Sequence, residues 1–303
     1  MISETIYDNS KFTLASDITV TPLDISVPDT KLLTEPVMLD NTIGVTRTRY
    51  QHPFYYYKND TIIGRSLAYY GEYTELELEC LKHFVKNNDC VIYDIGANIG
   101  YHTTAFARWC KYVEAFEPNS KNLELLKKNL VNMPHVMVYP YAVSDKKGTT
   151  TIQDFDTTVP GNYGEMYLNV PGQSCETVCI DDMDELYPPD IVKIDVEGHE
   201  LSVLRGMVKT IHEYKPVIFY EAHGTELDEI YDMLSAMDYK LYWFPCANYN
   251  PNNYNNSSYN IFGNGGVLNI IAVHGMKIGN LLPVLRNQSF KSAYEQYLQN
   301  NKE

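Results

Sequence analysis

Ionisable residues are concentrated in the segment DVEGHE (195–200), which directly follows an apolar run. A second group, EAH (221–223), follows the next apolar run of this kind. Carboxylates and imidazoles that lie together can accept a proton from a hydroxyl nucleophile, and carboxylates can also hold a divalent cation through oxygen ligands. The candidate catalytic residues are Glu197, His199, Glu221 and His223, and the candidate ligands for Mg²⁺ or Ca²⁺ are Asp195 and Glu221.

A glycine-rich turn, DIGANIG (94–100), ends an earlier apolar run. Glycines let the backbone approach a ligand closely at the start of a helix. Asn98 stands where a dinucleotide-binding G-x-G-x-x-G motif would have its second glycine, and the Asp94 carboxylate would repel a diphosphate. S-adenosylmethionine carries an ammonium and a sulfonium group instead. The turn therefore favours this cofactor, with Asp94 close to its methionyl end.

A third acidic position, Glu117, follows the next apolar run, and Asn119 comes two residues later. A carboxylate at this place accepts hydrogen bonds from a ribose diol in dinucleotide-binding folds. The alternative is that Glu117 is an ordinary surface residue of a turn. The adenine is expected near residues 141–144, and Asp145 either reaches it or only begins a turn. The predicted cofactor ligands are Asp94, Gly96, Ala97, Asn98, Gly100, Glu117, Asn119, Ala142 and Asp195.

Methyl transfer from such a cofactor to an alcohol requires alignment of the two reactants and removal of a proton. A base, or a metal ion that acidifies the hydroxyl, can assist the second requirement. The segments 195–200 and 221–223 would then face the transferred methyl group. The alternative is that Glu197 and Glu200 only complement the N-terminus of a following helix.

These segments belong to an alternation of predicted strands and helices. Strands are expected at 91–95, 112–116, 135–143, 190–195 and 216–221, with helices between them, and an antiparallel pair is expected at 240–246 and 266–275. Before the first strand, residues 61–73 are expected to form a strand and a turn, and 74–87 a helix that begins with a capping box of Thr74 and Glu77. Strands that alternate with helices predict an α/β fold with a mostly parallel, doubly wound sheet. The expected organisation is an N-terminal arm (1–59), one main domain (60–280) and a C-terminal helix (281–303).

Composition excludes several classes of partner. Lys and Arg total 24 and Asp and Glu total 39, so the formal net charge is 24 − 39 = −15. This charge opposes binding to the nucleic-acid backbone and to anionic membrane surfaces. The N-terminal residues resemble no signal peptide, no apolar stretch reaches the length of a membrane span, and the six cysteines have no metal-binding spacing. A cytoplasmic protein with free thiols is the expectation.

The chain resembles the FkbM family of S-adenosylmethionine-dependent methyltransferases. The resemblance rests on DIGANIGYHT, FEPN, AVSDKKG, DIVKIDVEGHELSVLRG and PVIFYEAH, and it spans roughly residues 60–275. It implies the Rossmann-like class I methyltransferase fold, with a seven-stranded sheet whose last strand is antiparallel. It also implies O-methylation, often of sugars or natural-product hydroxyls. Tyr73, Glu75 and the loop 162–164 are expected near the site by the same resemblance.

The leading hypothesis is an O-methyltransferase that acts on a sugar, a glycan or a small hydroxylated metabolite. The first fifty residues and the loop 246–264 have no counterpart in the FkbM family and are expected to define the substrate. The chain holds 26 Tyr, and the Asn- and Tyr-rich part of this loop, 249–259, is the candidate for acceptor binding, because aromatic rings stack on sugars and amides bind their hydroxyls. Two alternatives remain: a methyltransferase acting on RNA ribose, and a non-catalytic module that keeps only the cofactor pocket.

Overall fold

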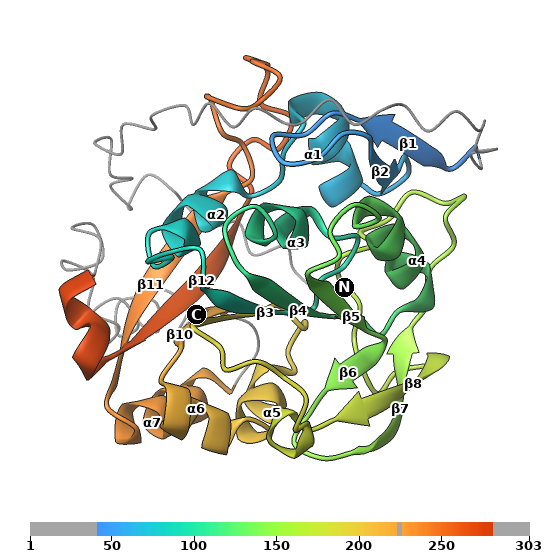
Figure 1. Cartoon of the computed structure of the whole chain (residues 1–303). Coiled ribbons are helices and arrows are strands. Elements are labelled where there is room, and N and C mark those ends of the chain that lie inside the picture. The colour runs from blue at the N-terminus through green and yellow to red at the C-terminus, as the bar shows by residue number, and fades with distance from the viewer. Residues whose placement is uncertain (1–40, 223–225, 281–303) are drawn as a thin grey trace, which may run out of the picture.

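A seven-stranded sheet in the order β11-β12-β10-β9-β3-β4-β5 forms the centre of the protein (Figure 1). The computed structural model describes residues 41–222 and 226–280. The strands of this sheet are β3 (Val91–Ile95), β4 (Tyr112–Phe116), β5 (Val136–Tyr139), β9 (Ile191–Ile194), β10 (Val217–Glu221), β11 (Tyr239–Ala247) and β12 (Gly266–His274). The pairs β10·β9, β9·β3, β3·β4 and β4·β5 are parallel, whereas β12 is antiparallel to both of its neighbours. The predicted doubly wound sheet with an antiparallel last strand is therefore confirmed.

Helices cover both faces of this sheet, with α2, α3 and α4 on one face and α5, α6 and α7 on the other (Figure 1). The helices are α1 (Ile63–Tyr70), α2 (Glu75–Lys82), α3 (Tyr101–Phe106), α4 (Ser120–Asn129), α5 (Glu200–Arg205), α6 (Val208–Tyr214) and α7 (Leu227–Ala236). A separate cluster of buried apolar side chains fills each interface: Leu81, Phe106 and Leu126 belong to one, and Leu204 and Ile211 to the other. Both faces of the sheet are buried, which explains why its strands are continuous apolar runs in the sequence.

The order of the strands reverses between β3 and β9. After β3 the chain adds β4 and β5 on one side, and then returns to place β9 and β10 on the other. In open α/β sheets a ligand binds outside the carboxyl ends of the strands at such a reversal. The fold therefore places the turn after β3 next to the segment after β9.

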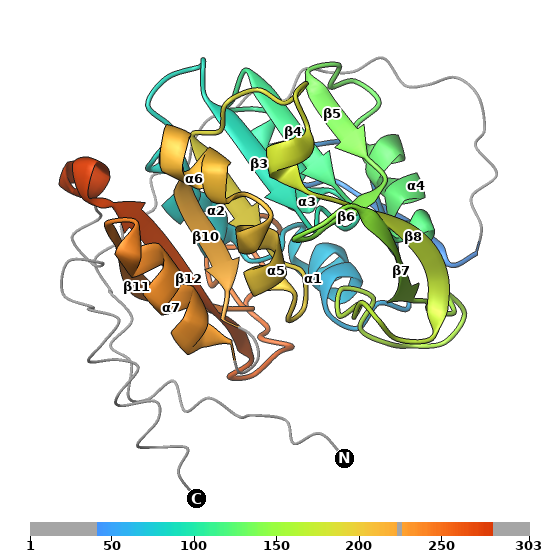
Figure 2. The same cartoon turned by 90° about the horizontal axis from the view of Figure 1, so that it is seen from below.

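The third predicted strand is divided at Pro140. Residues before it form β5 in the main sheet, and residues after it form β6 (Tyr141–Val143) in a smaller sheet, β6-β8-β7 (Figure 2). Proline lacks the N–H group that a continuing ladder needs, which accounts for the break. The partners β7 (Gly148–Gln153) and β8 (Gly172–Val178) were not expected from the sequence.

The segment before the main sheet differs from the prediction. Residues 61–73 were expected to form a strand and a turn, but they contain helix α1, which ends at Gly71 with a φ of 68°. Ile63, Leu67 and Tyr70 are buried at a helical spacing and provide the apolar face of this helix. A two-stranded pair, β1 (Ile43–Thr46) and β2 (Phe54–Tyr57), precedes it.

The helix expected after β9 is broken into α5 and α6 at Gly206. A Cβ atom at this residue would lie 2.0 Å from the carbonyl oxygen of Ser144, so the close approach requires glycine. A 3-10 turn (Ile180–Asp182) precedes β9, and a second (Gly275–Asn280) follows β12. The expected C-terminal helix and most of the N-terminal arm lie outside the described residues, and the division into domains stays a prediction.

The six cysteines are free thiols, as expected. Within residues 41–222 and 226–280, we find no helix with both the length and the apolar character that crossing a bilayer requires.

Candidate active site

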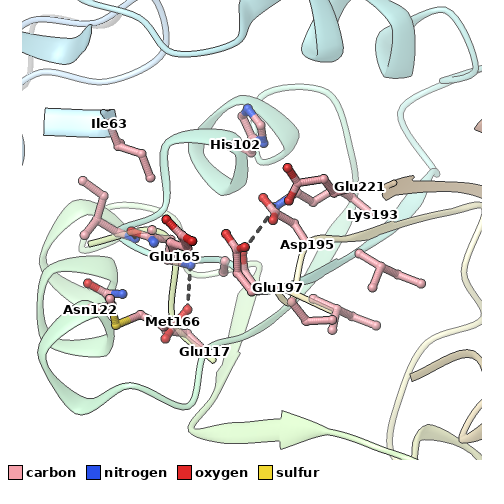
Figure 3. Close-up of a pocket in the computed structure, with 18 of the residues that line it drawn as sticks. Ile63, His102, Glu117, Asn122, Glu165, Met166, Lys193, Asp195, Glu197 and Glu221 are labelled. Atoms are coloured by element: carbon pink, nitrogen blue, oxygen red, sulfur yellow. Dashed lines mark hydrogen bonds and ion pairs between the residues drawn. The ribbon is translucent and has the colours of Figure 1, made fainter. Parts of the chain in front are cut away.

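A cavity of about 320 Å³ opens at the carboxyl ends of β3, β4, β9 and β10. Figure 3 shows Lys193, Asp195, Glu197 and Glu221 at one end of it and Glu117 at the other. Most of the residues predicted to bind the cofactor or catalyse the reaction line this cavity: Gly96, Ala97, Asn98, Gly100, Glu117, Ala142, Asp195, Glu197 and Glu221.

The glycine-rich turn after β3 adopts left-handed backbone conformations, with φ of 84° at Gly96, 50° at Asn98 and 89° at Gly100. Asparagine tolerates this region better than most side chains, which explains how Asn98 can replace a glycine. A Cβ atom at Gly96 would lie only 1.8 Å from the carbonyl oxygen of Asp195. The turn therefore packs directly against the end of β9.

Glu117 braces this turn from the end of β4. Its Oε2 accepts a hydrogen bond of 2.8 Å from the backbone N–H of Asn98, and its Oε1 accepts one of 2.8 Å from Asn119 N–H. Burial raises the pKa of Glu117 to about 7, although these two hydrogen bonds act in the opposite direction. The carboxylate lines the cavity at the end of β4, the strand position at which an acidic residue binds a ribose diol in dinucleotide-binding folds.

Asn119 does not line the cavity. Its side chain caps α4 by accepting hydrogen bonds from the backbone N–H groups of Lys121 at 3.0 Å and Asn122 at 3.4 Å. This is an ordinary N-cap arrangement, and it differs from the predicted role as a cofactor ligand.

The adenine end of the predicted cofactor site is apolar. Tyr141, Ala142 and Val143 line the cavity there, together with Ile152 and Met166 from the region of the smaller sheet. Ser144 and Asp145 lie outside the set of described lining residues.

Asp94 lies behind the cavity and does not line it, which differs from its predicted direct contact with the methionyl group. It is fully buried, accepts a hydrogen bond of 2.6 Å from Thr103 Oγ1, and its Oδ1 lies 3.5 Å from Lys193 Nζ. Burial raises the pKa of Asp94, while the Lys193 charge opposes that change. Asp94 therefore supports the cavity floor through Lys193.

Three carboxylates converge at the opposite end of the cavity. Asp195, Glu197 and Glu221 each offer an oxygen atom, and these atoms lie within 4.8 Å of one another. Burial and the charges of Asp195 and Glu197 raise the pKa of Glu221 well above its ordinary value. Burial acts in the same direction on Asp195, but the ion pair of 3.2 Å with Lys193 outweighs it and lowers the pKa. The group can share protons or bind a cation.

The turn that carries Glu197 is strained. Glu197 has a φ of 53°, which is unusual for a residue with a long side chain, and Gly198 follows at 87°. Glu200 folds back over this turn, and its Oε1 accepts hydrogen bonds from the N–H groups of Val196 at 3.3 Å and Gly198 at 3.2 Å. The predicted helix-terminus role thus suits Glu200, whereas Glu197 points to the cavity.

Of the two histidines predicted as catalytic groups, His199 is the one within the described residues. The Nε2 atom of His199 lies 3.0 Å from Ser144 Oγ, and His199 is outside the described lining of the cavity. Ser144 follows β6, so the His199 ring lies toward the end of that strand. His223 lies outside the described residues.

Sequence reasoning missed three ionisable residues of the cavity: Glu77, His102 and Lys193. Glu77 makes no capping box, because Thr74 has a left-handed conformation and no side-chain cap bond. Instead it accepts a hydrogen bond of 3.0 Å from Asn269 Nδ2, and burial raises its pKa to about 8. Lys193 lies inside the apolar strand β9. A lysine within an otherwise apolar run was the sequence feature that could have identified it as a residue of the site.

His102 follows the glycine-rich turn, and its Nε2 lies 2.9 Å from Thr74 Oγ1. Burial, with a smaller contribution from the Lys193 charge, lowers its pKa to about 3, so the ring is neutral. The Tyr73 ring stacks against it at 6.1 Å.

The cover of the carboxylate end comes from segments far apart in the chain. Tyr73, Asn162, Gly164, Asn248 and Asn269 all line the cavity. The structure therefore places Tyr73 and the loop 162–164, both expected near the site, in the lining of this cavity. The structure does not place Glu75 there, because its carboxylate bonds the hydroxyls of Tyr50 and Tyr101 and lies away from the cavity.

The strand order and this cavity, with a glycine-rich turn on β3, an acid on β4 and carboxylates on β9, are those of the class I methyltransferase fold. A family model described as the Methyltransferase FkbM domain matches residues 94–241. Residues 94–241 are thus similar to FkbM methyltransferase domains, a family whose members use S-adenosylmethionine.

The chain is similar to a curated protein, the hexuronic acid methyltransferase AglP of Haloferax volcanii, with 28% identity over 151 residues. The match spans 48% of this chain and 62% of that relative's length.

Among solved structures, the chain resembles an FkbM methyltransferase of Methylobacillus flagellatus at a TM-score of 0.43 and 20% identity, covering 61% of this chain and 44% of that one. It also resembles a putative methyltransferase of Streptococcus mutans in complex with SAH, at a TM-score of 0.36 and 10% identity, covering 66% and 96%.

Proposed function

We propose that this protein transfers a methyl group from S-adenosylmethionine to a hydroxyl group of a sugar or another small hydroxylated acceptor. The observation that carries the proposal is one cavity that joins the Glu117-braced turn to the carboxylates of Asp195, Glu197 and Glu221. The turn suits a nucleoside with its ribose on Glu117, and the carboxylate end suits a cationic methyl donor and a hydroxyl acceptor.

The residues of the turn fit this cofactor. Gly96 and Gly100 keep the backbone bare of side chains beside the cavity, and Glu117 presents a carboxylate where two ribose hydroxyls can donate. When bound, S-adenosylmethionine supplies an electrophilic methyl group on a sulfonium. The chain's own contribution is to hold the acceptor in line with that methyl group.

In this proposal the carboxylates of Asp195, Glu197 and Glu221 remove the proton from the acceptor hydroxyl. Asp195 stays ionised because Lys193 lies 3.2 Å away, and it can orient the acceptor hydroxyl. Glu221 and Glu197 can pass a proton between them and accept one from the hydroxyl, since Asp195, Glu197 and Glu221 have oxygens within 4.8 Å of one another. His102 is neutral and offers a hydrogen bond rather than a charge.

A divalent cation is the other way in which these carboxylates could serve the reaction. The oxygens of Asp195 and Glu221, with Glu197 as a third ligand, suit Mg²⁺ or Ca²⁺. A bound ion would lower the pKa of the acceptor hydroxyl. Dialysis against a chelator followed by re-addition of Mg²⁺ tests this role: activity that survives the first step rejects it.

A carbohydrate acceptor is favoured by two observations. The similar protein of Haloferax volcanii is named for a hexuronic acid, which is a sugar. The cover of the carboxylate end also combines a tyrosine ring, Tyr73, with the amides of Asn162, Asn248 and Asn269, which suit the faces and hydroxyls of a sugar.

The test has two stages. Addition of S-adenosylmethionine or S-adenosylhomocysteine should raise the unfolding temperature through binding linkage. Radiolabelled methyl transfer to a panel of sugars and hydroxylated metabolites, with an RNA arm, then identifies the acceptor class. An absent thermal shift at millimolar ligand would contradict the cofactor proposal, and transfer confined to RNA would replace the acceptor proposal.

A further inference from the structure

The acceptor end of the cavity carries far more negative than positive charge. Glu77, Glu165, Asp195, Glu197 and Glu221 line it, whereas Lys193 is the one lysine or arginine among the described lining residues. These carboxylates come from separate parts of the chain: α2, the loop before β8, the end of β9 and the end of β10. Their convergence is thus a property of the tertiary fold.

Lys193 is already paired. Its Nζ atom lies 3.2 Å from Asp195 Oδ2 and 3.5 Å from Asp94 Oδ1, and it donates a hydrogen bond of 3.2 Å to the carbonyl of Gly96. Its direct ion pairs are therefore with Asp94 and Asp195, and among the described residues no lysine or arginine forms an ion pair with Glu77, Glu197 or Glu221.

Glu77 and Glu221 are held near each other by one amide. Asn269 lies opposite Glu221 in the β10·β12 register, and its Nδ2 donates to Glu77 at 3.0 Å. Glu77 also adds to the electrostatic repulsion felt by Glu221. A neutral amide satisfies part of the hydrogen bonding of Glu77 but does not compensate its charge.

Burial makes the ionised form of Glu77 costly, and the one lysine that lines the cavity, Lys193, is held by Asp94 and Asp195. The cofactor supplies one net positive charge, because its ammonium and sulfonium are opposed by its own carboxylate. A further cation in the acceptor end would stabilise the ionised carboxylates, whereas an anion would meet like charges in a partly buried space.

We propose that the acceptor is a hydroxylated compound that also carries a basic amino group, such as an amino sugar, and that its ammonium lies between Glu77, Glu197 and Glu221. This proposal rests on the proposed function. It separates this chain from a hexuronic acid acceptor, because the carboxylate of that sugar would face the same side chains.

Matched methyl glycosides test the proposal. Sets of gluco, galacto and manno configuration, each with a hydroxyl, an amino or a carboxylate group at one position, are added to protein saturated with S-adenosylhomocysteine, and the unfolding temperature is measured. At least one amino glycoside should stabilise the complex at a concentration about tenfold lower than its hydroxyl match, which corresponds to about 1.4 kcal/mol. The uronic acid match should give no shift. Equal responses, a uronic acid preference, or no response to any amino glycoside would overturn the proposal.

A matched pair of variants tests whether Glu77 is responsible for the preference for amino glycosides. Glu77→Gln should reduce the amino-to-hydroxyl ratio of apparent affinities at least about threefold. Glu79→Gln is the control, because Glu79 lies on the same helix outside the described lining of the cavity. A ratio unaffected by Glu77→Gln, or one that appears only with Mg²⁺ present, would also overturn the proposal. Loss of the thermal shift with S-adenosylhomocysteine alone would instead contradict the proposed function.

Discussion

The side-chain amide of Asn250 donates a hydrogen bond of 2.8 Å to Glu72, a residue 178 positions earlier in the chain. The Glu72 carboxylate also accepts hydrogen bonds from Tyr254 N–H at 2.7 Å and from Arg49 at 3.3 Å. One buried carboxylate therefore joins the Asn- and Tyr-rich loop between β11 and β12 to the segment that precedes β3. Both parts contribute residues to the cover of the acceptor end, so this cover is one connected unit.

Glu72→Gln should loosen this cover. The new amide nitrogen would face donors, and we expect a loss of about 1–3 kcal/mol in the free energy of unfolding. Acceptor affinity should fall while affinity for S-adenosylhomocysteine stays close to that of the parent, because the cofactor turn is elsewhere. Chemical denaturation and hydrogen exchange of residues 248–262 measure the effect. Glu176→Gln, at an exposed site on β8, is the control. Equal hydrogen-exchange rates of residues 248–262 in the two variants would argue against a role of Glu72 in holding this loop.

Glu117→Gln should weaken cofactor binding. The change replaces one of the two oxygens that accept the N–H groups of Asn98 and Asn119 and removes the charge offered to the ribose. Hydrogen bonds to charged groups contribute about 1.5–3 kcal/mol, so we expect the Kd for S-adenosylmethionine to rise by roughly 10- to 100-fold. Calorimetric titration measures it against Glu124→Gln, an exposed position on α4. An unchanged Kd would remove Glu117 from the cofactor site.

Gly96→Ala and Gly263→Ala separate two costs of replacing a glycine. Both residues have positive φ, 84° and 58°, so each alanine should lose about 1–2 kcal/mol through backbone strain. At Gly263 no atom lies within 4 Å of the added carbon, whereas at Gly96 the carbonyl oxygen of Asp195 lies at 1.8 Å. We therefore expect Gly96→Ala to be much less stable than Gly263→Ala and to lose cofactor binding. Similar unfolding temperatures for the two variants would contradict the close packing.

Binding of S-adenosylmethionine should release protons. Burial raises the pKa of Glu77, Glu117 and Glu197 to about 8, 7 and 9, above the ordinary value of 4.5. Such groups stabilise the folded state fully below about pH 4.5, and this contribution is lost as the pH rises through the raised values. The unliganded protein should therefore lose stability as the pH rises from about 4.5 to 9, while a cationic ligand, which favours the ionised forms, should bind more tightly over the same range.

Calorimetry in two buffers with different heats of ionisation measures this proton release. S-adenosylhomocysteine has no sulfonium charge and should show a weaker dependence on pH. Equal pH dependence for the two ligands would mean that the carboxylates do not respond to the sulfonium.

Glu221→Gln and His199→Ala should separate a catalytic role from a structural one. Glu221 lines the cavity, and its replacement should lower kcat at least about tenfold with little change in cofactor affinity. His199 bonds Ser144, so His199→Ala should lower stability without a comparable loss of kcat. Single-turnover rates at saturating cofactor give the comparison, and a larger loss of rate in His199→Ala would reverse the assignment.

The sequence predicted the parts of the site that sit on buried strands. Uninterrupted apolar runs mark those strands, so the residues that end them, such as Glu117, Asp195 and Glu221, could be placed at one edge of a sheet. The side chains that come from other elements could not be placed in this way. Glu77 satisfied a local capping pattern, and its real partner, Asn269, is 192 residues away.

Other errors also have physical causes. Lys193 was overlooked because its neighbours define a buried strand, and only the pairing with Asp94 and Asp195 explains a charge there. The smaller sheet was missed because β7 and β8 are rich in polar residues that give no clear alternation. His199 was expected at the site because it follows the end of a strand, but such a position does not determine the direction of the side chain.

The close packing of Gly96 against the Asp195 carbonyl has a consequence for how this protein can change over evolution or in the laboratory. Any mutation that moves the backbone after β9 would also displace the glycine-rich turn before α3. These two segments are therefore expected to change only together. The loop between β11 and β12 is joined to the rest through side chains such as Glu72, which can be exchanged one at a time. New acceptor preferences are therefore expected to arise by substitution within residues 248–262. A library of variants at these positions is the most direct way to alter acceptor selectivity.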